Sequence, residues 1–486
     1  MSGRLNLPGR PQLLTYPDSL GGSIRAIGNL LRGPLDGVFS GVHILPPFPS
    51  SGDRGFAPLT YREIDPAFGT WADIDQLARD HDVVLDLMIN HISRQSAEFR
   101  DFERHGRRSR YADLFITLDK IWPSADPPEE DVSRIFLRKP QDPFSTVTVE
   151  DTRQTERIWT TFGSEQIDID VNTTAARKLM SQSLRLFASH GVRVVRLDAV
   201  GYVIKKAGTT CFMVEPEIYE FLDWIVGVAG SLGLIVLPEI HDHHTTHDKL
   251  AAHGFWSYDF VLPALVLHAL ETRSASKLAA HLARSPQRQF TTLDCHDGIP
   301  IEPDLEQILS HSEMIELVEL VERQGGNVNR ILSKSVSTGV AAHQLNCTYY
   351  AALGCDDDRY VAARAIQLFA PGVPQIYYVG LLAGENDYEA LNQVGDGRAV
   401  NRHNFTDEEI DLALKLSVVQ RILRLIRLRQ CHPAFEGSLA IESRAPGLLR
   451  LRWKQHEDTC ELNVDLASDT CVVTTRDRTS SDQFLA

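Results

Sequence analysis

Short apolar runs alternate with longer stretches of helical period along most of the chain. Runs of this kind, joined by crossover helices, are typical of parallel strands. Eight such strands predict a closed (β/α)8 TIM barrel of the α/β class. The predicted strands are Gln12–Tyr16, Gly37–Leu45, Val83–Ile89, Val192–Leu197, Leu234–Leu237, Tyr258–Leu262, Phe290–Leu293 and Pro374–Val379.

Two polar stretches interrupt this alternation. Residues 92–171, after the third strand, contain prolines and no clear helical period, and we expect an inserted domain there. Residues 298–353, after the seventh strand, predict a second insertion with a helix over Ile308–Arg323, which Gly325 and Gly326 end. The barrel itself would then comprise residues 1–91, 172–297 and 354–432.

The last part of the chain changes its period. Thr406 and Glu409 form a capping box that predicts a helix over Asp407–Arg429. Beyond Pro433, apolar and polar residues alternate at 448–454 and 460–466. This pattern predicts a small antiparallel β-domain over residues 433–486.

Composition narrows the class of protein. The chain has 486 residues, 43% of them hydrophobic, and a formal net charge of -16. Nucleic acid and anionic membrane would be repelled, so neither is expected as a partner. No apolar run approaches the roughly 18 residues of a membrane span, and the start of the chain lacks the apolar core of a signal peptide. The seven scattered cysteines favour reduced thiols, and so a cytoplasmic protein.

Three acidic residues stand where predicted strands end. Asp198, Glu239 and Asp297 would meet at one rim of the barrel, since the C-terminal strand ends carry the chemistry of this fold. Arg196 shares a strand face with Asp198 and would keep it ionised. Each acid alone is more often a helix cap or part of a structural ion pair. Together they suit glycoside chemistry, in which one carboxylate attacks the anomeric carbon and another protonates the leaving oxygen.

Several strings carry a family resemblance. INH at 89–91, RLDAVG at 196–201, LPEIH at 237–241 and LDCHDGI at 293–299 resemble the four short motifs of the α-amylase superfamily, glycoside hydrolase family 13. GVHILPPFPSSGDRGFAPLTY, AGTTCFM, NCTYYAALG, RAIQLFAPGVPQIYYVGLLAGEND and GRAVNRH look more narrowly like its sucrose phosphorylase group. This resemblance covers nearly the whole chain.

The resemblance implies roles for individual residues. Asp198 would be the nucleophile, Glu239 the general acid/base and Asp297 the transition-state stabiliser of a retaining mechanism. Retention through a covalent β-glucosyl–aspartate needs the carboxyls of Asp198 and Glu239 about 5–5.5 Å apart. The residues implied to surround or line the glucosyl site are Asp53, Phe56, His91, Phe162, Gln166, Arg196, His296 and Arg398.

The acceptor side of the site, which binds the group joined to the glucosyl unit, decides the substrate. In the family resembled, Arg138 and Lys139 of the first insertion, and His343 and Gln344 of the second, face this side. Tyr202 and His241, just past two catalytic positions, are expected to contact phosphate. Sucrose-specific members of the group typically have a Pro-Arg pair in place of Arg138-Lys139, and a tyrosine in place of His343. The residues found here resemble those of relatives that act on sucrose 6′-phosphate, although from spacing alone Arg138-Lys139 is ordinary solvated loop charge.

The expected activity is therefore reversible phosphorolysis of sucrose 6′-phosphate, with some activity on sucrose. Inorganic phosphate would be the co-substrate, with no other cofactor. A zinc site in the cluster His241, His243, His244 and His247 is an alternative, but this chemistry needs no metal.

Other functions remain open. Phosphorylases of sucrose, glucosylglycerol or glucosylglycerate would share the glucosyl half of the site. An amylase-like hydrolase or transglucosidase would share all three carboxylates. A catalytically silent scaffold is disfavoured because no carboxylate is missing. The oligomeric state, including a homodimer, is not set by the sequence.

Overall fold

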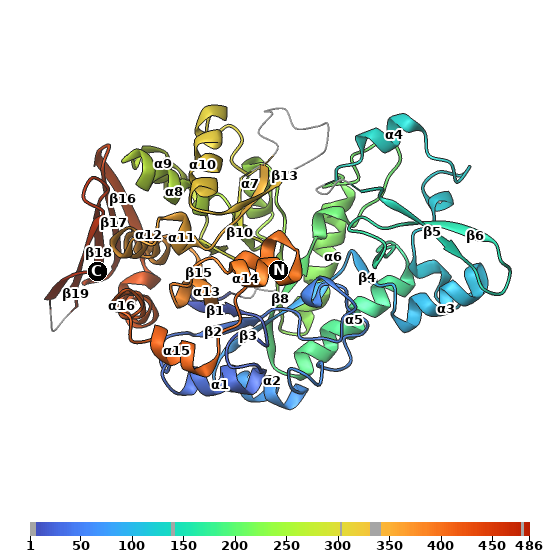
Figure 1. Ribbon diagram of the computed structural model, residues 1–486, viewed down its shortest axis with the longest axis horizontal. Helices are drawn as coiled ribbons and strands as arrows, with labels where there is room; N and C mark the ends of the chain where they lie inside the picture. The colour runs from blue at the N-terminus through green and yellow to red at the C-terminus, as the bar shows by residue number, and fades with distance from the viewer. Residues whose placement is uncertain (1–5, 138–140, 302–303, 331–341, 478–480) are drawn as a thin grey trace. The chain divides into compact units, whose positions relative to one another are not determined.

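The computed structural model describes residues 6–137, 141–301, 304–330, 342–477 and 481–486 (Figure 1). The predicted acceptor residues Arg138 and Lys139 lie outside these ranges. The described residues fall into two compact units. The first unit holds residues 44–137 and 141–240 with Arg330. The second unit holds residues 6–43, 241–301, 304–329, 342–477 and 481–486.

Three parallel strands form the sheet of the first unit. They are β3 (Asp82–Met88), β8 (Val192–Asp198) and β9 (Ile235–Pro238). Nearly every residue of these strands is buried, as continuous apolar runs predict. Their register aligns Asp86 with Arg196, and Arg196 with Leu237. Helix α2 (Trp71–Leu77) precedes β3, α5 (Thr174–Ser189) precedes β8, and α6 (Glu217–Ser231) connects β8 to β9.

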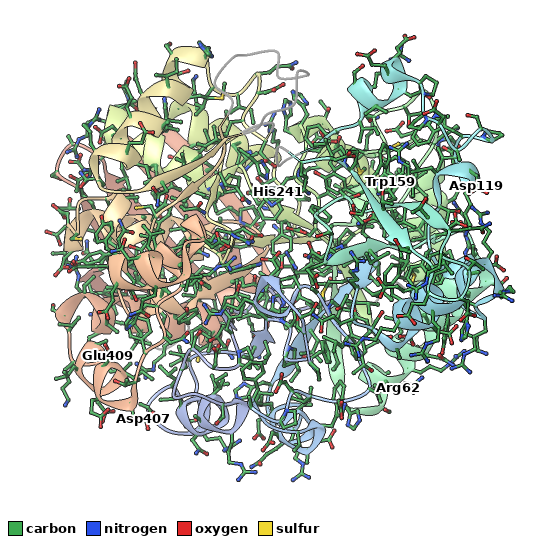
Figure 2. The ribbon with its side chains drawn as sticks, turned by 45° about the vertical axis from the view of Figure 1, so that its right-hand side comes forward. Arg62, Asp119, Trp159, His241, Asp407 and Glu409 are labelled. Carbon is green, nitrogen blue, oxygen red and sulfur yellow. The ribbon has the colours of Figure 1, made fainter. Side chains whose placement is uncertain are left out.

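The segment between β3 and α5 has its own hydrophobic core. Trp122 and Trp159 stack with ring centroids 5.7 Å apart, and Phe144 meets Trp159 edge-on. Trp159, labelled in Figure 2, is the last residue of β6 (Thr155–Trp159). The sequence showed no clear helical period here, but the described residues of this segment include two short α-helices. Its elements are β4 (His91–Ser93), α3 (Ala97–His105), α4 (Glu129–Arg134), β5 (Phe144–Thr148), β6 (Thr155–Trp159) and β7 (Gln166–Asp168). The domain boundaries at 92 and 171 stay predictions.

The second unit holds the other barrel strands. These are β1 (Gln12–Thr15), β10 (Ser257–Asp259), β11 (Gln289–Thr291) and β15 (Val373–Tyr377), with β2 (Gly41–Ile44) ending at the boundary between the units. Its helices include α1 (Ile24–Arg32), α7 (His244–Ala252), α8 (Leu262–Thr272), α9 (Ser276–Arg284), α11 (Tyr349–Ala352), α12 (Asp357–Phe369), α13 (Tyr378–Leu381) and α14 (Tyr388–Val394).

The sheet order β10-β11-β15-β1-β2-β3-β8-β9 is the chain order of a (β/α)8 barrel. All eight predicted strands are present, which confirms the predicted fold class. One strand is shorter than predicted for a local reason. The Asp259 carboxylate accepts hydrogen bonds from the backbone N–H groups of Val261 and Leu262, so β10 ends there and α8 begins.

The second inserted segment contains a small sheet. β12 (Ile299–Pro300) and β13 (Asn327–Arg330) flank β14 (Ala342–Asn346). The helix predicted over Ile308–Arg323 is α10 (His311–Arg323). It starts later because Ser310 and Glu313 form a capping box.

The predicted helix over Asp407–Arg429 is wrong as a single helix. It is divided into α15 (Asp407–Ala413) and α16 (Ser417–Cys431), because Leu416 adopts an extended conformation. The predicted capping box is confirmed, and Figure 2 shows Asp407 and Glu409 at the first turn of α15.

The antiparallel sheet predicted at the C-terminus is confirmed. Its strands pair in chain order: β16 (Ser438–Ala445), β17 (Leu448–Gln455), β18 (Asp458–Asp465), β19 (Thr470–Arg476) and β20 (Ser481–Leu485). Trp453 of this sheet donates a hydrogen bond to the carbonyl of Phe369 at the end of α12. All seven cysteines are described and are free thiols. Within the described residues, no helix has the length and apolar character that crossing a membrane requires.

Candidate active site

Arg196 of β8 lies between acidic groups from neighbouring strands. Its Nη1 is 3.2 Å from Asp198 Oδ1, and its Nη2 is 3.0 Å from Glu239 Oε1. Nη1 also donates to Asp86 of β3, which is fully buried. The predicted pairing of Arg196 with Asp198 is confirmed, and one guanidinium joins the two carboxylates expected to carry the chemistry.

Glu239 is fixed on both sides. It directly follows β9, and its backbone N–H donates to the carbonyl of Leu197 at 3.0 Å. Its Oε2 accepts from the backbone N–H of Ala199 at 3.0 Å. Ala199 adopts the left-handed conformation, φ 51°, which turns the chain sharply after Asp198. Glu239 and Asp198 are both 9% exposed, so they remain reachable from outside the barrel core.

A second group in the first unit surrounds His91, the first residue of β4. The Phe56 carbonyl accepts hydrogen bonds from His91 Nε2 at 2.9 Å and from Gln166 Nε2 at 3.1 Å. The Phe162 ring lies 5.3 Å from the His91 ring. Burial, the largest cause, lowers the pKa of His91, although Asp168 and Asp53 act in the opposite direction. These predicted sugar-binding residues therefore lie together.

Aromatic rings extend this group toward the end of β8. Tyr202 meets Phe162 edge-on at 5.1 Å and lies 4.8 Å from Phe212. Phe56 lies beneath the Arg196 guanidinium at 5.8 Å. The apolar faces of these aromatic rings suit contact with a sugar ring, and the polar groups beside them would orient its hydroxyls.

In the second unit, Asp297 lies among cationic groups. Its Oδ1 is 3.3 Å from Arg398 Nη1 and 3.6 Å from Arg402 Nη2, and its Oδ2 is 3.4 Å from His296 Nε2. The Asn346 amide donates to its carbonyl at 2.8 Å. Asp297 thus lies with both sugar-binding residues that were predicted beside it.

Arg398 itself is held by Asp396. The carboxylate of Asp396 accepts from Nη2 of Arg398 at 2.9 Å. Burial would raise the pKa of Asp396, but the Arg398 hydrogen bonds outweigh it and lower this pKa to about 2. The Arg402 Nε donates to the His296 carbonyl at 2.7 Å, which ties the two segments together.

The predicted acceptor residues of the second unit also gather. His241 stacks on Phe260 with centroids 3.8 Å apart, and His343 meets it edge-on at 5.5 Å. His241 Nδ1 is 3.5 Å from the fully buried Asp304. Burial opposes ionisation of Asp304, but His241 and His247 outweigh it, so the pKa of Asp304 is lowered. Gln344 follows His343 along β14 and pairs with Pro300 of β12.

The predicted residues outside positions 138 and 139 thus lie in these groups, except Gln344, which is placed only by its strand pairing. The approach of Asp297 to Asp198 and Glu239 stays a prediction, as does their spacing of about 5–5.5 Å. No cluster of three or more His, Cys, Asp or Glu side chains suited to a metal ion occurs in the ranges that the structure describes.

Several polar residues were missed by sequence reasoning. Asp86 had a detectable signal, because it is an acid within an otherwise apolar strand, DVVLDLM. Asp304, Arg402 and Lys205 had none, since each resembles an ordinary loop charge until its burial is known.

A parallel barrel with a pair of carboxylates at its strand ends is typical of glycoside-processing barrel enzymes. Residues 37–254 match the family model described as alpha amylase, catalytic domain. The chain is 51% identical over 466 residues to the sucrose 6(F)-phosphate phosphorylase of Thermoanaerobacterium thermosaccharolyticum, covering 95% of each. It is 40% identical to the glucosylglycerol phosphorylase of Marinobacter adhaerens, covering 96% of each.

A crystal structure of sucrose 6F-phosphate phosphorylase from Thermoanaerobacter thermosaccharolyticum superposes with a TM-score of 0.98 at 48% identity, covering 100% of both chains. The sucrose phosphorylase of Streptococcus mutans is 40% identical over 97% of this chain and 98% of its own. The chain therefore belongs to the sucrose phosphorylase group of glycoside hydrolase family 13.

Proposed function

We propose that the chain catalyses reversible phosphorolysis of sucrose 6′-phosphate to α-glucose 1-phosphate and fructose 6-phosphate. The observation that carries glucosyl transfer is the Arg196 guanidinium, which binds both Asp198 and Glu239. The identity to relatives named as phosphorylases supports phosphate as the group that receives the glucosyl unit. The 51% identity to a sucrose 6(F)-phosphate phosphorylase supports the choice of substrate.

In the first half-reaction, the Asp198 carboxylate attacks the anomeric carbon of the glucosyl unit. The bond to the fructosyl oxygen breaks, and Glu239 gives that oxygen its proton. The result is a β-glucosyl ester on Asp198 and free fructose 6-phosphate. Asp297 would stabilise the positive charge that develops on the ring.

In the second half-reaction, a phosphate oxygen attacks the same carbon and the ester bond to Asp198 breaks. The attacking phosphate gives its proton to the Glu239 carboxylate. Two inversions at one carbon give net retention and α-glucose 1-phosphate. Water must be kept from this step, and the aromatic rings of Phe56, Phe162 and Tyr202 suit that task.

Hydrogen-bond donors on the acceptor side would discriminate sucrose 6′-phosphate from sucrose. His241 and His343 lie in ring contact in the second unit. Arg138 and Lys139 are proposed to join them in binding phosphate groups. An imidazole in place of a phenol suits a phosphorylated fructose, because it can donate a charge-assisted hydrogen bond when protonated.

The test compares sucrose, sucrose 6′-phosphate and glucosylglycerol, each with and without inorganic phosphate, by measuring α-glucose 1-phosphate. We expect product only with phosphate, and kcat/KM for sucrose 6′-phosphate at least about tenfold above that for sucrose. One hydrogen bond to a charged group is worth about 1.5–3 kcal/mol, which corresponds to that factor. Asp198→Asn is the control and should yield no product.

Two outcomes would change the assignment. A higher kcat/KM for sucrose would contradict the substrate but leave phosphorolysis standing. Rapid glucose release without phosphate would favour the amylase-like hydrolase. The cytoplasmic location and the homodimer stay predictions, and inorganic phosphate is the only co-substrate that the proposed cycle needs.

A further inference from the structure

A lysine that no predicted role includes lies buried in the first unit. The Lys205 side chain is 1% exposed, and its Nζ is 2.8 Å from Asp168 Oδ2, whose side chain is fully buried. Nζ also donates to Asn90 Oδ1 at 3.2 Å, Thr161 Oγ1 at 3.0 Å and the Tyr202 carbonyl at 2.5 Å. One cation thus binds the segments that carry His91, Phe162 and Tyr202.

The chemistry of an ammonium group settles how the Asn90 amide is oriented. Lysine can only donate hydrogen bonds, so the amide atom facing Lys205 must be the oxygen. The amide nitrogen then faces the other way, 3.4 Å from Nδ1 of His91. Because this nitrogen only donates, Nδ1 of His91 must be the unprotonated acceptor.

A neutral His91 of this kind carries its proton on Nε2. That nitrogen is 2.9 Å from the Phe56 carbonyl, which only accepts. The contacts at the two ends of the imidazole therefore favour the same tautomer. Gln166 Nε2, 3.2 Å from His91 Nε2, donates to the same carbonyl, which has two lone pairs.

The opposite arrangement fails at both ends. Turning the Asn90 amide over would place its two donors against the Lys205 ammonium. Protonating Nδ1 instead of Nε2 would leave a lone pair of His91 against the carbonyl of Phe56. Both conflicts are buried, so water cannot relieve them.

We propose that Lys205 is a positioning residue that acts through Asn90 to hold His91 in the Nε2–H tautomer, and so sets the donor of the glucosyl site. Recognition of the sugar through this donor rests on the proposed function, whereas the tautomer does not. Because Nε2 has one proton, a sugar hydroxyl would take it in place of the Phe56 carbonyl or share it with that carbonyl.

The sharpest test is Asn90→Asp, which keeps the size of the side chain and an oxygen toward Lys205. It replaces the donor toward His91 with an acceptor, so Nδ1 should become protonated. Long-range 1H–15N NMR on protein labelled with 15N-histidine reports the tautomer, with the His91 signal assigned through His91→Gln. We expect Nε2–H in the wild type, Nδ1 protonation in Asn90→Asp, and kcat/KM lower by about tenfold or more.

Lys205 itself is tested in the double variant Lys205→Met/Asp168→Asn, because removing the lysine alone leaves a buried carboxylate uncompensated. The share of His91 protonated at Nδ1 should then rise, although the Phe56 carbonyl still favours Nε2–H. An unchanged tautomer would show that Lys205 does not hold it. The matched control is Lys206→Met, since this neighbouring lysine is exposed and pairs with Glu217. It should leave both the tautomer and kcat/KM unchanged.

Wild-type His91 protonated at Nδ1 would overturn the proposal, as would an Nδ1 that stays unprotonated in Asn90→Asp. If the tautomer changes in Asn90→Asp but the wild-type protein shows no phosphorolysis, the proposal about Lys205 stands and the proposed function is contradicted.

Discussion

Arg196 has more acidic partners than its strand pattern predicts. The side-chain alternation of β8 places it beside Asp198, but Asp86 and Glu239 come from the neighbouring strands β3 and β9. Three carboxylates around one guanidinium would repel each other without it. The planar fork of arginine can reach several oxygens at fixed angles, which an ammonium cannot.

Arg196→Lys should therefore cause a large loss of kcat/KM and only a small loss in the free energy of unfolding. Lysine keeps the charge but cannot hold Asp198 and Glu239 together, and small misplacements at a reacting centre cost about 100-fold. Steady-state kinetics would show this loss, with thermal unfolding as the check on folding. Retention of activity within about threefold of the wild type would contradict the role of the fork.

At the scale of elements, the β12–β14 pair places the acceptor residues. Ile299 pairs with Leu345 and Pro300 with Gln344. The approach is close because Gly298 has φ 116°, and a Cβ there would lie 2.5 Å from the Leu345 carbonyl oxygen. Only glycine fits both the backbone conformation and the space.

Gly298→Ala should push β14 away and disturb Gln344 and His343. We expect a loss of about 1–3 kcal/mol in the free energy of unfolding, measured by urea denaturation. The kcat/KM for the fructosyl substrate should fall as well. Gly233→Ala is the matched control, since Gly233 has φ 79° but nothing within 4 Å of an added Cβ. An equal kcat/KM in both variants would argue against this placement.

For the whole molecule, buried histidines set the response to mild acid. Burial lowers the pKa of His91, and also that of His268, although Glu313 opposes the shift at His268. A histidine with a lowered folded pKa binds fewer protons than in the unfolded chain, whose pKa is about 6.5. The free energy of unfolding must therefore fall as the pH drops below about 7.

We expect the urea midpoint to be level from about pH 8 to 7 and to decrease from about pH 7 to 5. His268→Gln should flatten this decrease, because it removes one of the groups responsible. The slope is compared rather than the level, since the variant also loses the hydrogen bond to Glu313. A stability that rises toward pH 5 would contradict the sign of these shifts.

Local pattern was enough for much of the architecture. The eight strands follow from short apolar runs, the capping box from the spacing of Thr406 and Glu409, and the terminal antiparallel sheet from a period of two, all of which neighbouring residues determine. The single helix over Asp407–Arg429 was wrong because an extended Leu416 leaves no mark in that period. Strand ends also marked Asp198, Glu239 and Asp297, since parallel strands present chemistry at one end.

What the sequence determined by itself is thus the fold class, its motifs and the residues at the strand ends. Tertiary structure alone decided their partners: Asp86 and Glu239 on Arg196, Arg402 beside Asp297, Asp304 beside His241, and Lys205 behind Asn90. The physical reason is the distance along the sequence between the interacting residues. Periodicity depends on residues a few positions apart, whereas the partner of a buried charge comes from any segment that folding brings within hydrogen-bond distance.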